Sequence, residues 1–105
     1  MTPGAGSCLY GGSKAAVDGI TATLAIELGQ KGIRVNAINP GMTLTAQLDE
    51  LPFVTPEFLS LVRGMTPLQR LGTAEEIAGA AVALCSHQTA SWITGQCVRV
   101  SGGFR

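Results

Sequence analysis

The sequence predicts an α/β fold built on a parallel sheet that is incomplete in this chain. A helical segment is followed by a tight turn, a strand and a second turn, which together resemble the second half of a βαβ unit and imply a parallel sheet. Only two strand-like segments are found in 105 residues, and two strands do not make a stable sheet by themselves. Because a buried parallel strand needs neighbours on both edges, we expect the chain to be part of a larger sheet or to pair with one.

The first helix is predicted over residues 13–28, after a turn-rich loop at residues 1–9. The helical segment is dense in Ala and Leu, and its apolar residues recur at spacings of three and four, which defines one helix face. Gly29 and Gly32 are of the residue type that ends helices. The expected apolar stripe consists of Val17, Ile20, Leu24 and Leu28.

The first strand is predicted at residues 33–38, where the sequence is short, apolar and partly β-branched. The segment Asn39-Pro40-Gly41 closes this strand with a turn. Arg34 lies inside the strand, and a guanidinium that is buried needs a partner. We therefore expect Arg34 to form a structural ion pair.

A short helix is predicted to begin at Thr55-Pro56-Glu57, between loops at residues 42–54 and 64–72. Thr caps such a helix, Pro fits its first position, and Glu interacts favourably with its positive end. A further helix is predicted to begin at Thr73, because Thr73 and Glu76 have the spacing of a capping box. In both helices apolar residues then follow at helical spacing.

The chain is expected to end in a second strand at residues 96–100, terminated by Gly102-Gly103. A polar connection at residues 86–91 precedes it. Trp92 is expected to pack beneath this last strand. The organisation is thus loop, helix, strand, loop, helix, loop, helix and strand, without an internal repeat.

Composition and charge exclude several classes of protein. Seven basic and seven acidic residues cancel, so no basic field attracts nucleic acid or anionic lipid. No segment approaches the apolar run of a membrane span, and the N-terminus lacks a signal-peptide pattern. The three cysteines are odd in number and far apart, so neither a disulfide framework nor a metal site is expected. We therefore expect a cytoplasmic, metal-free protein whose cysteines are small packing residues.

Tyr10 and Lys14 are the strongest candidates for chemistry. They lie four residues apart at the start of the first helix, so both side chains point to one side. An ammonium close to a phenol favours the phenolate and lowers the Tyr pKa. A phenol tuned in this way can exchange a proton with a hydroxyl or carbonyl group. A surface Tyr beside a surface Lys would show the same spacing, so the pair alone is weak evidence.

Four segments in sequence order resemble the short-chain dehydrogenase/reductase family, and most closely its 3-oxoacyl-carrier-protein reductase-type branch. Residues 10–17 are similar to its Tyr-x-x-x-Lys segment, and residues 32–41 to its next strand and Pro-Gly turn. Residues 67–78 resemble its late loop and helix, and residues 93–103 its final strand. The resemblance implies that residues 1–105 are the C-terminal part of one Rossmann-type doubly wound parallel sheet.

The resemblance also implies a function. Tyr10 would be the general acid/base of an NAD(P)-dependent oxidoreductase, and Lys14 would lower its pKa and bind the nicotinamide ribose. Around the Pro-Gly turn, Pro40, Gly41, Thr43 and Thr45 would contact the cofactor, which could be NAD or NADP. The substrate would be a small-molecule alcohol or carbonyl compound, and the full-length form would be a homo-oligomer.

The family's glycine-rich phosphate loop and its catalytic Ser and Asn have no counterpart in these residues. The N-terminal dinucleotide-binding half is therefore expected to be absent, and the isolated chain is expected to bind dinucleotide poorly. This leaves an alternative of another class, a catalytically inactive fragment that acts as an interaction or oligomerisation module. Its support is the high apolar content of 46% and the small residues of segment 13–28, which are compatible with close helix packing.

Overall fold

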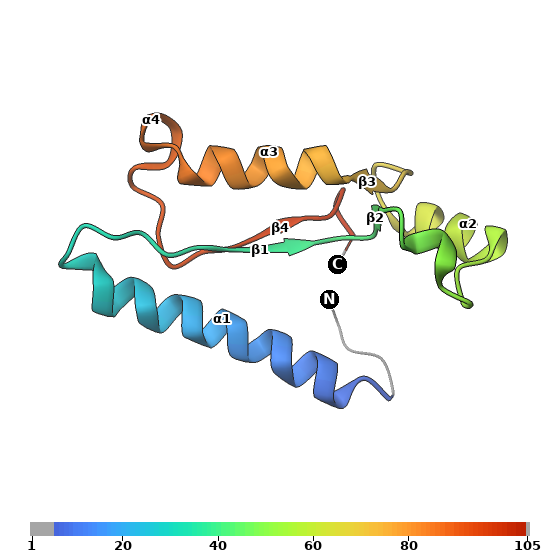
Figure 1. Cartoon of the computed structure of the whole chain (residues 1–105), viewed down its shortest axis with the longest axis horizontal. Helices are drawn as coiled ribbons and strands as arrows, with labels where there is room; N and C mark the ends of the chain where they lie inside the picture. Colours follow the sequence, from blue (N-terminus) through green and yellow to red (C-terminus); the bar gives the residue numbers. More distant parts are fainter. Residues whose placement is uncertain (1–5, 105) are drawn as a thin grey trace.

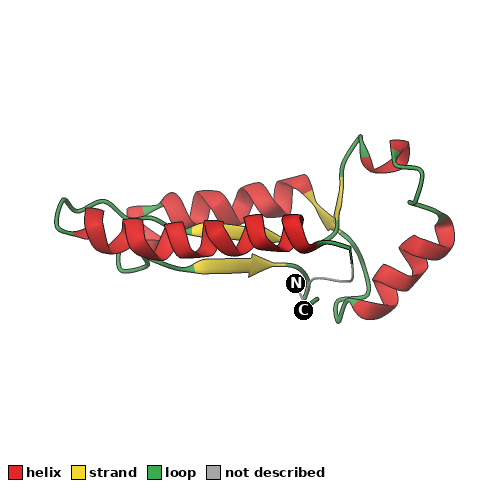
Figure 2. Ribbon diagram, turned by 90° about the horizontal axis from the view of Figure 1, so that it is seen from below, coloured by secondary structure: helices red, strands yellow, loops and turns green. Residues whose placement is uncertain are grey.

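The computed structural model describes residues 6–104, apart from the side chain of Asp49. The elements are, in chain order, α1 (Cys8–Gly29), β1 (Ala37–Pro40), β2 (Thr43–Leu44), the 3₁₀ turn η1 (Leu48–Glu50), α2 (Pro56–Met65), β3 (Gly72–Thr73), α3 (Ala74–Cys85), α4 (His87–Ala90) and β4 (Cys97–Val100). The two long helices α1 and α3 lie on opposite sides of the paired strands β1 and β4 (Figure 1). Helix α2 lies beyond one end of these layers, as Figure 1 and Figure 2 both show.

Strands β1 and β4 pair in parallel, with Ala37 opposite Cys97 and Pro40 opposite Val100. The two-residue strands β2 and β3 also pair in parallel. The predicted α/β class with parallel strands is therefore confirmed, and so is the incompleteness, because the described residues form only these two small sheets. The short strands β2 and β3, the turn η1 and the single helical turn α4 were not predicted, since none is long enough to show a period.

Both predicted helix starts are confirmed. At α2, the Phe58 amide donates to the Thr55 hydroxyl at 3.1 Å, and Pro56 occupies the first turn. Hydrogen bonds from its own backbone amide and from the Thr55 side chain lower the pKa of Glu57. At α3, the Glu76 amide donates to the Thr73 hydroxyl, and the Thr73 amide donates to the Glu76 carboxylate, which completes the capping box.

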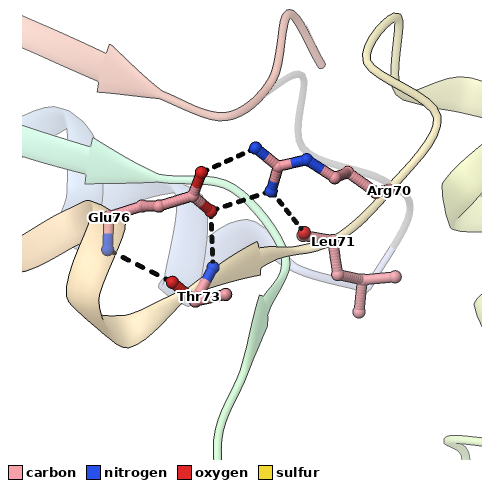
Figure 3. A network of polar contacts seen from close by, with 4 residues as sticks. All are labelled: Arg70, Leu71, Thr73 and Glu76. Atoms are coloured by element: carbon pink, nitrogen blue, oxygen red, sulfur yellow. Dashed lines mark hydrogen bonds and ion pairs between the residues drawn. The ribbon is translucent and has the colours of Figure 1, made fainter.

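Glu76 also joins the start of α3 to the loop before it (Figure 3). Arg70 donates to both carboxylate oxygens of Glu76, at 2.6 and 2.8 Å, and to the Leu71 carbonyl at 3.1 Å. The hydrogen bond with Arg70 and the Thr73 amide lower the pKa of Glu76 to about 2. A bidentate guanidinium–carboxylate pair fixes orientation as well as distance, so it holds the loop against the helix N-terminus.

Helix α1 begins at Cys8 rather than at Ser13, because the Gly11 amide donates to the Ser7 carbonyl and closes an earlier turn. The predicted loop therefore ends earlier, and its residues 1–5 lie outside the described part. Two of the four residues of the predicted apolar stripe, Leu24 and Leu28, are half-buried, whereas the other two are exposed. Ile20 is 57% exposed, whereas the residues buried along α1 are Thr21 and Ala25. The small side chains of this helix, rather than its large ones, are thus the most deeply covered.

The predicted strand at residues 33–38 is shifted, because β1 begins only at Ala37. Arg34 forms no ion pair within the part of the chain that the structure describes. Its guanidinium donates to three carbonyl oxygens, those of Leu84 at 2.7 Å, Cys85 at 3.1 Å and Ile93 at 3.1 Å. Two of these carbonyls belong to the last turn of α3, where a cation offsets the negative end of the helix. Arg34 thus has the partners that its charge requires, but they are backbone carbonyls and not the carboxylate that was expected.

Trp92 does not pack beneath the last strand, because its side chain is 98% exposed. Cys8 and Cys85 are also exposed, whereas Cys97 is half-buried, so the expectation of three packing cysteines is wrong for two of them. The apolar side chains that are buried within the described residues are few, namely Ala25, Leu48, Val62, Leu71 and Ala90. None of the helices in the described part is long and apolar enough to cross a membrane.

Candidate active site

A cleft of about 450 Å³ lies between the N-terminal half of α1 and the ends of β1 and β4. Tyr10 and Lys14 line it from α1, and Pro40 and Gly41 line it from the end of β1. Four of the six residues predicted from the sequence are therefore brought together. The volume falls within the range of about 300–1,000 Å³ that is usual for sites of small ligands.

Tyr10 and Lys14 face one another across one turn of α1. The Lys14 ammonium nitrogen lies 5.2 Å from the centroid of the Tyr10 ring, within the range of a cation–π contact. Tyr10 is 55% exposed, and its carbonyl accepts a hydrogen bond from the Ser13 hydroxyl at 2.7 Å. Among residues 6–104, the phenol and the ammonium have no hydrogen-bond or ion-pair partner. Both groups are thus available to a ligand in the cleft.

Glycine is required at position 41 because the backbone there closely approaches Ser101, the residue that follows β4. A Cβ at position 41 would lie 2.7 Å from the Ser101 Cα and 2.8 Å from the Ser101 Cβ, which is too close for any side chain. The Gly41 amide also donates to the Val100 carbonyl at 2.9 Å. The sequence suggested that this glycine allows a cofactor to approach the backbone. The geometry adds a structural reason, namely the close approach of the two strand ends that form one wall of the cleft.

Thr43 and Thr45 do not line the cleft. Thr43 lies in β2, and its hydroxyl donates to the Gly41 carbonyl at 2.9 Å. Thr45 is exposed, and its carbonyl accepts from the Leu48 amide at 3.0 Å. Thr43 thus supports the turn that carries Gly41, whereas neither threonine side chain is placed beside Tyr10 and Lys14.

Asp18 and Arg99 also line the cleft, and neither was predicted from the sequence. Asp18 follows Lys14 by one helical turn, and a hydrogen bond with its side chain raises the pKa of the Cys97 thiol, with a smaller effect of burial. Arg99 alternates with Val98 and Val100 along β4, so its side chain leaves the opposite face of the strand. This alternation was the signal available in the sequence, because a charged residue between two valines marks the face that does not belong to the core.

The sequence of this chain is similar to those of known proteins. A family model described as enoyl-(acyl carrier protein) reductase matches residues 1–105. The 7alpha-hydroxysteroid dehydrogenase of Escherichia coli (strain K12) is 46% identical over 94 residues, which cover 90% of this chain and 36% of that protein. The chain therefore spans little more than a third of the length of this curated relative.

Solved structures give the same result. The crystal structure of a hydroxysteroid dehydrogenase from Escherichia coli matches with a TM-score of 0.88 and 43% identity, over 95% of this chain and 41% of that one. A 3-oxoacyl-[acyl-carrier protein] reductase from Brucella melitensis with bound NAD matches with a TM-score of 0.80 and 40% identity, over 92% of this chain and 33% of that one. At these levels of identity the shared fold extends along nearly the whole chain.

Proposed function

The chain belongs to the short-chain dehydrogenase/reductase family, and from this membership we propose that it carries the proton-transfer part of an NAD(P)-dependent oxidoreductase site. Tyr10 is the general acid/base in this proposal, and Lys14 is its partner. The observation that carries it is the position of a phenol and an ammonium in one cleft, 5.2 Å from ring centroid to nitrogen, with no hydrogen-bond partner among the described residues. A small-molecule alcohol or carbonyl compound is the substrate.

In carbonyl reduction, Tyr10 donates its phenolic proton to the substrate oxygen, and in alcohol oxidation it takes that proton back. Lys14 lies beside this phenol, with its ammonium nitrogen 5.2 Å from the centroid of the Tyr10 ring. A phenol needs no metal ion for this step, because it exchanges the proton directly. The nicotinamide cofactor, when bound, supplies or accepts the hydride.

The hydrogen-bond donors of the cleft suit the hydroxyl groups of a nicotinamide ribose. Lys14 offers ammonium donors that no carboxylate engages within residues 6–104, and Gly41 presents backbone without a side chain. We assign ribose binding to Lys14, and cofactor contacts to the turn formed by Pro40 and Gly41. Contacts from the Thr43 backbone and the Thr45 hydroxyl are retained as proposals. They require the segment after the turn to approach the cleft more closely.

Both NAD and NADP are proposed as cofactors, since one structural neighbour was solved with bound NAD and another is described as an NADPH-dependent reductase. The names of the relatives point to steroid hydroxyl groups and to 3-oxoacyl thioesters as substrate classes. Because the chain spans 36% of the first relative's length, the activity of a whole enzyme is itself a proposal. The three free thiols favour a cytoplasmic location.

A chimera tests the proposed role of Tyr10. Residues 1–105 would replace the matching segment of the Escherichia coli 7alpha-hydroxysteroid dehydrogenase, and oxidation of NADH or NADPH would be followed. We expect turnover in the chimera, and we expect Tyr10→Phe to lower kcat by about 10²–10⁴-fold, the usual contribution of general acid/base catalysis. A folded chimera in which Tyr10→Phe retains full turnover would contradict the proposal. The isolated chain is expected to show negligible turnover in the same assay.

An interaction module remains a second candidate, because α1 leaves large apolar side chains uncovered. Leu9 and Ile26 are 91% and 79% exposed, and uncovered apolar surface of this kind marks sites of association. Assembly into homo-oligomers would cover it. Analytical ultracentrifugation of the 105-residue chain tests this candidate, and a monomer at all concentrations would remove its support.

A further inference from the structure

The cleft carries an excess of positive charge. Its ionisable residues are Tyr10, Lys14, Asp18 and Arg99. Lys14 and Asp18 lie one helical turn apart and have opposite charges, so they offset one another in the field of the cleft. The Asp18 side chain also has a partner in the Cys97 thiol. The two cations and the one carboxylate among the described lining residues thus leave one net positive charge, and Arg99 is the cation that lies on the wall opposite α1.

Among the described residues, the Arg99 guanidinium has no partner. Within the described residues the salt bridge found is that between Arg70 and Glu76, and no hydrogen bond engages the Arg99 side chain. The contrast with Arg34 is informative, because that guanidinium donates to three carbonyl oxygens. A planar guanidinium with five unused donors is suited to bind a carboxylate or phosphate in a bidentate manner.

Much of the remaining wall of the cleft is apolar, although Ser7, Asn39 and Ser101 also line it. Val17 and Ile38 line it from α1 and β1, and Phe104 lines it beyond the end of β4. The Ser101 hydroxyl donates to the Phe104 carbonyl at 2.8 Å, which holds this segment beside Arg99. A largely apolar wall that carries the Arg99 guanidinium on the side of β4, apart from Lys14 on α1, fits a ligand that has an apolar body and an anionic end.

We propose that the substrate of this site is an anionic carbonyl or alcohol compound whose carboxylate or phosphate group binds Arg99 while its reacting oxygen faces Tyr10. This inference rests on the proposed oxidoreductase function and narrows its substrate class. Arg99 is in this view a specificity-determining residue, since a neutral analogue would leave its charge without a partner. The apolar walls favour a substrate over the cofactor as the source of the anion, because a dinucleotide places its phosphates between two polar sugars.

Two matched ligands test the proposal on the 105-residue chain. The anion of 4-oxocyclohexanecarboxylic acid and its neutral carboxamide share the ring and the ketone and differ in charge. Their dissociation constants would be measured by titration of backbone amide signals in NMR spectra. We expect the acid to bind about tenfold more tightly than the amide, which is the effect of a charge-assisted hydrogen-bonded pair at a partly solvated site.

Arg99→Gln is expected to abolish this preference and to leave the affinity of the amide unchanged. Arg63→Gln, which removes an exposed guanidinium from α2 outside the cleft, is the matched control and should preserve the preference. Should Arg99→Gln fail to fold, added salt provides a second measurement on the unaltered chain. It should weaken binding of the acid and leave the amide unaffected.

Three results would overturn the proposal: equal affinities of the unaltered chain for acid and amide, no detectable binding of the acid, or a preference that survives Arg99→Gln. In the chimera, a loss of affinity for NADPH or NADH in Arg99→Gln would also overturn it, since the anion would then belong to the cofactor. The chimera with Tyr10→Phe tests the oxidoreductase function separately. If turnover is unaffected by Tyr10→Phe, the catalytic role of Tyr10 is rejected. If the acid preference is found in the same study, the anion site still stands.

Discussion

The Cα of Ser101 lies 2.7 Å from the point where a Cβ at Gly41 would stand. Since Ser101 contributes backbone to this contact, the strand ends must separate before any side chain fits at position 41. Gly41→Ala is therefore expected to destabilise the fold by about 1–3 kcal/mol, the usual cost of overpacking. Urea unfolding followed by circular dichroism measures this change in the free energy of unfolding.

Gly72→Ala is the matched control for Gly41→Ala. Its added Cβ would meet the Thr43 hydroxyl at 3.7 Å, which is an ordinary van der Waals distance. Gly41 directly follows β1 and Gly72 begins β3, so both substitutions lie at the end of a short parallel strand. Equal unfolding midpoints for the two variants would show that the contact with Ser101 is not what requires glycine at position 41.

Arg34 is expected to stabilise the C-terminal end of α3. Replacing it by Met keeps much of the apolar stem and removes the donors to Leu84, Cys85 and Ile93. We expect Arg34→Met to lower the free energy of unfolding by about 1.5–3 kcal/mol, the range for hydrogen bonds to a charged group. Arg34→Lys should recover little of the loss, because an ammonium cannot reproduce the planar fork.

The location of this effect can be measured by hydrogen exchange. Faster amide exchange in the last turn of α3 and around Thr94 would accompany the loss of Arg34, because Thr94 bonds to the neighbouring Val35 amide. Unchanged exchange in both segments would contradict the assigned role. An increase spread evenly over the chain would also contradict it, since that would indicate global destabilisation only.

Local chemistry explains which parts of the fold could be predicted. The starts of α2 and α3 were predicted correctly because a cap depends on residues three positions apart, Thr55 with Phe58 and Thr73 with Glu76. The buried side of α1 could not be predicted from periodicity, because its deepest residue, Thr21, satisfies its hydroxyl on the Val17 carbonyl and so tolerates burial.

In the candidate site, too, the residues close in sequence could be predicted, and the residue from a distant strand could not. Tyr10 and Lys14 are neighbours on one helix, so their pairing follows from sequence spacing. Arg99 enters the same cleft from a strand at the other end of the chain, and only the packing of β4 beside β1 places it there. The exposure of Trp92 could not be predicted from its residue type, since this large apolar side chain was expected in the core and is 98% exposed.

Glu76 should make stability depend on pH in the acidic range. Its folded pKa is about 2, below the ordinary value of 4.5, because it binds Arg70 and the Thr73 amide. A lowered folded pKa means that the stabilisation is fully present above pH 4.5 and is lost as the pH falls towards 2. Glu76→Gln removes this group, so its stability deficit relative to the unaltered chain should shrink over that interval.

Chemical denaturation at a series of pH values measures the dependence on Glu76. Glu75→Gln is a suitable control, because it removes an adjacent first-turn carboxylate and leaves the Arg70 pair intact. Its difference from the unaltered chain should vary less with pH than that of Glu76→Gln. A deficit for Glu76→Gln that stays constant between pH 5 and 2 would contradict a lowered pKa at this carboxylate.

Cys97 is expected to react more slowly with alkylating reagents than Cys8 and Cys85. The hydrogen bond with Asp18 and partial burial raise the pKa of its thiol above the ordinary 9.0, and the thiolate is the reactive form. The two other cysteines are exposed. Asp18→Asn removes the negative charge, so the pKa of Cys97 should fall and its alkylation by iodoacetamide at pH 8 should become several-fold faster.

Mass spectrometry of digested samples follows all three cysteines in one reaction. Cys85 is the internal control, because it lies at the end of α3, away from Asp18 and the cleft. Faster alkylation of both Cys97 and Cys85 in Asp18→Asn would indicate loosening of the fold rather than an electrostatic effect. An unchanged rate at Cys97 would show that the Asp18 carboxylate does not control the thiol, and that burial against α1 accounts for its low reactivity.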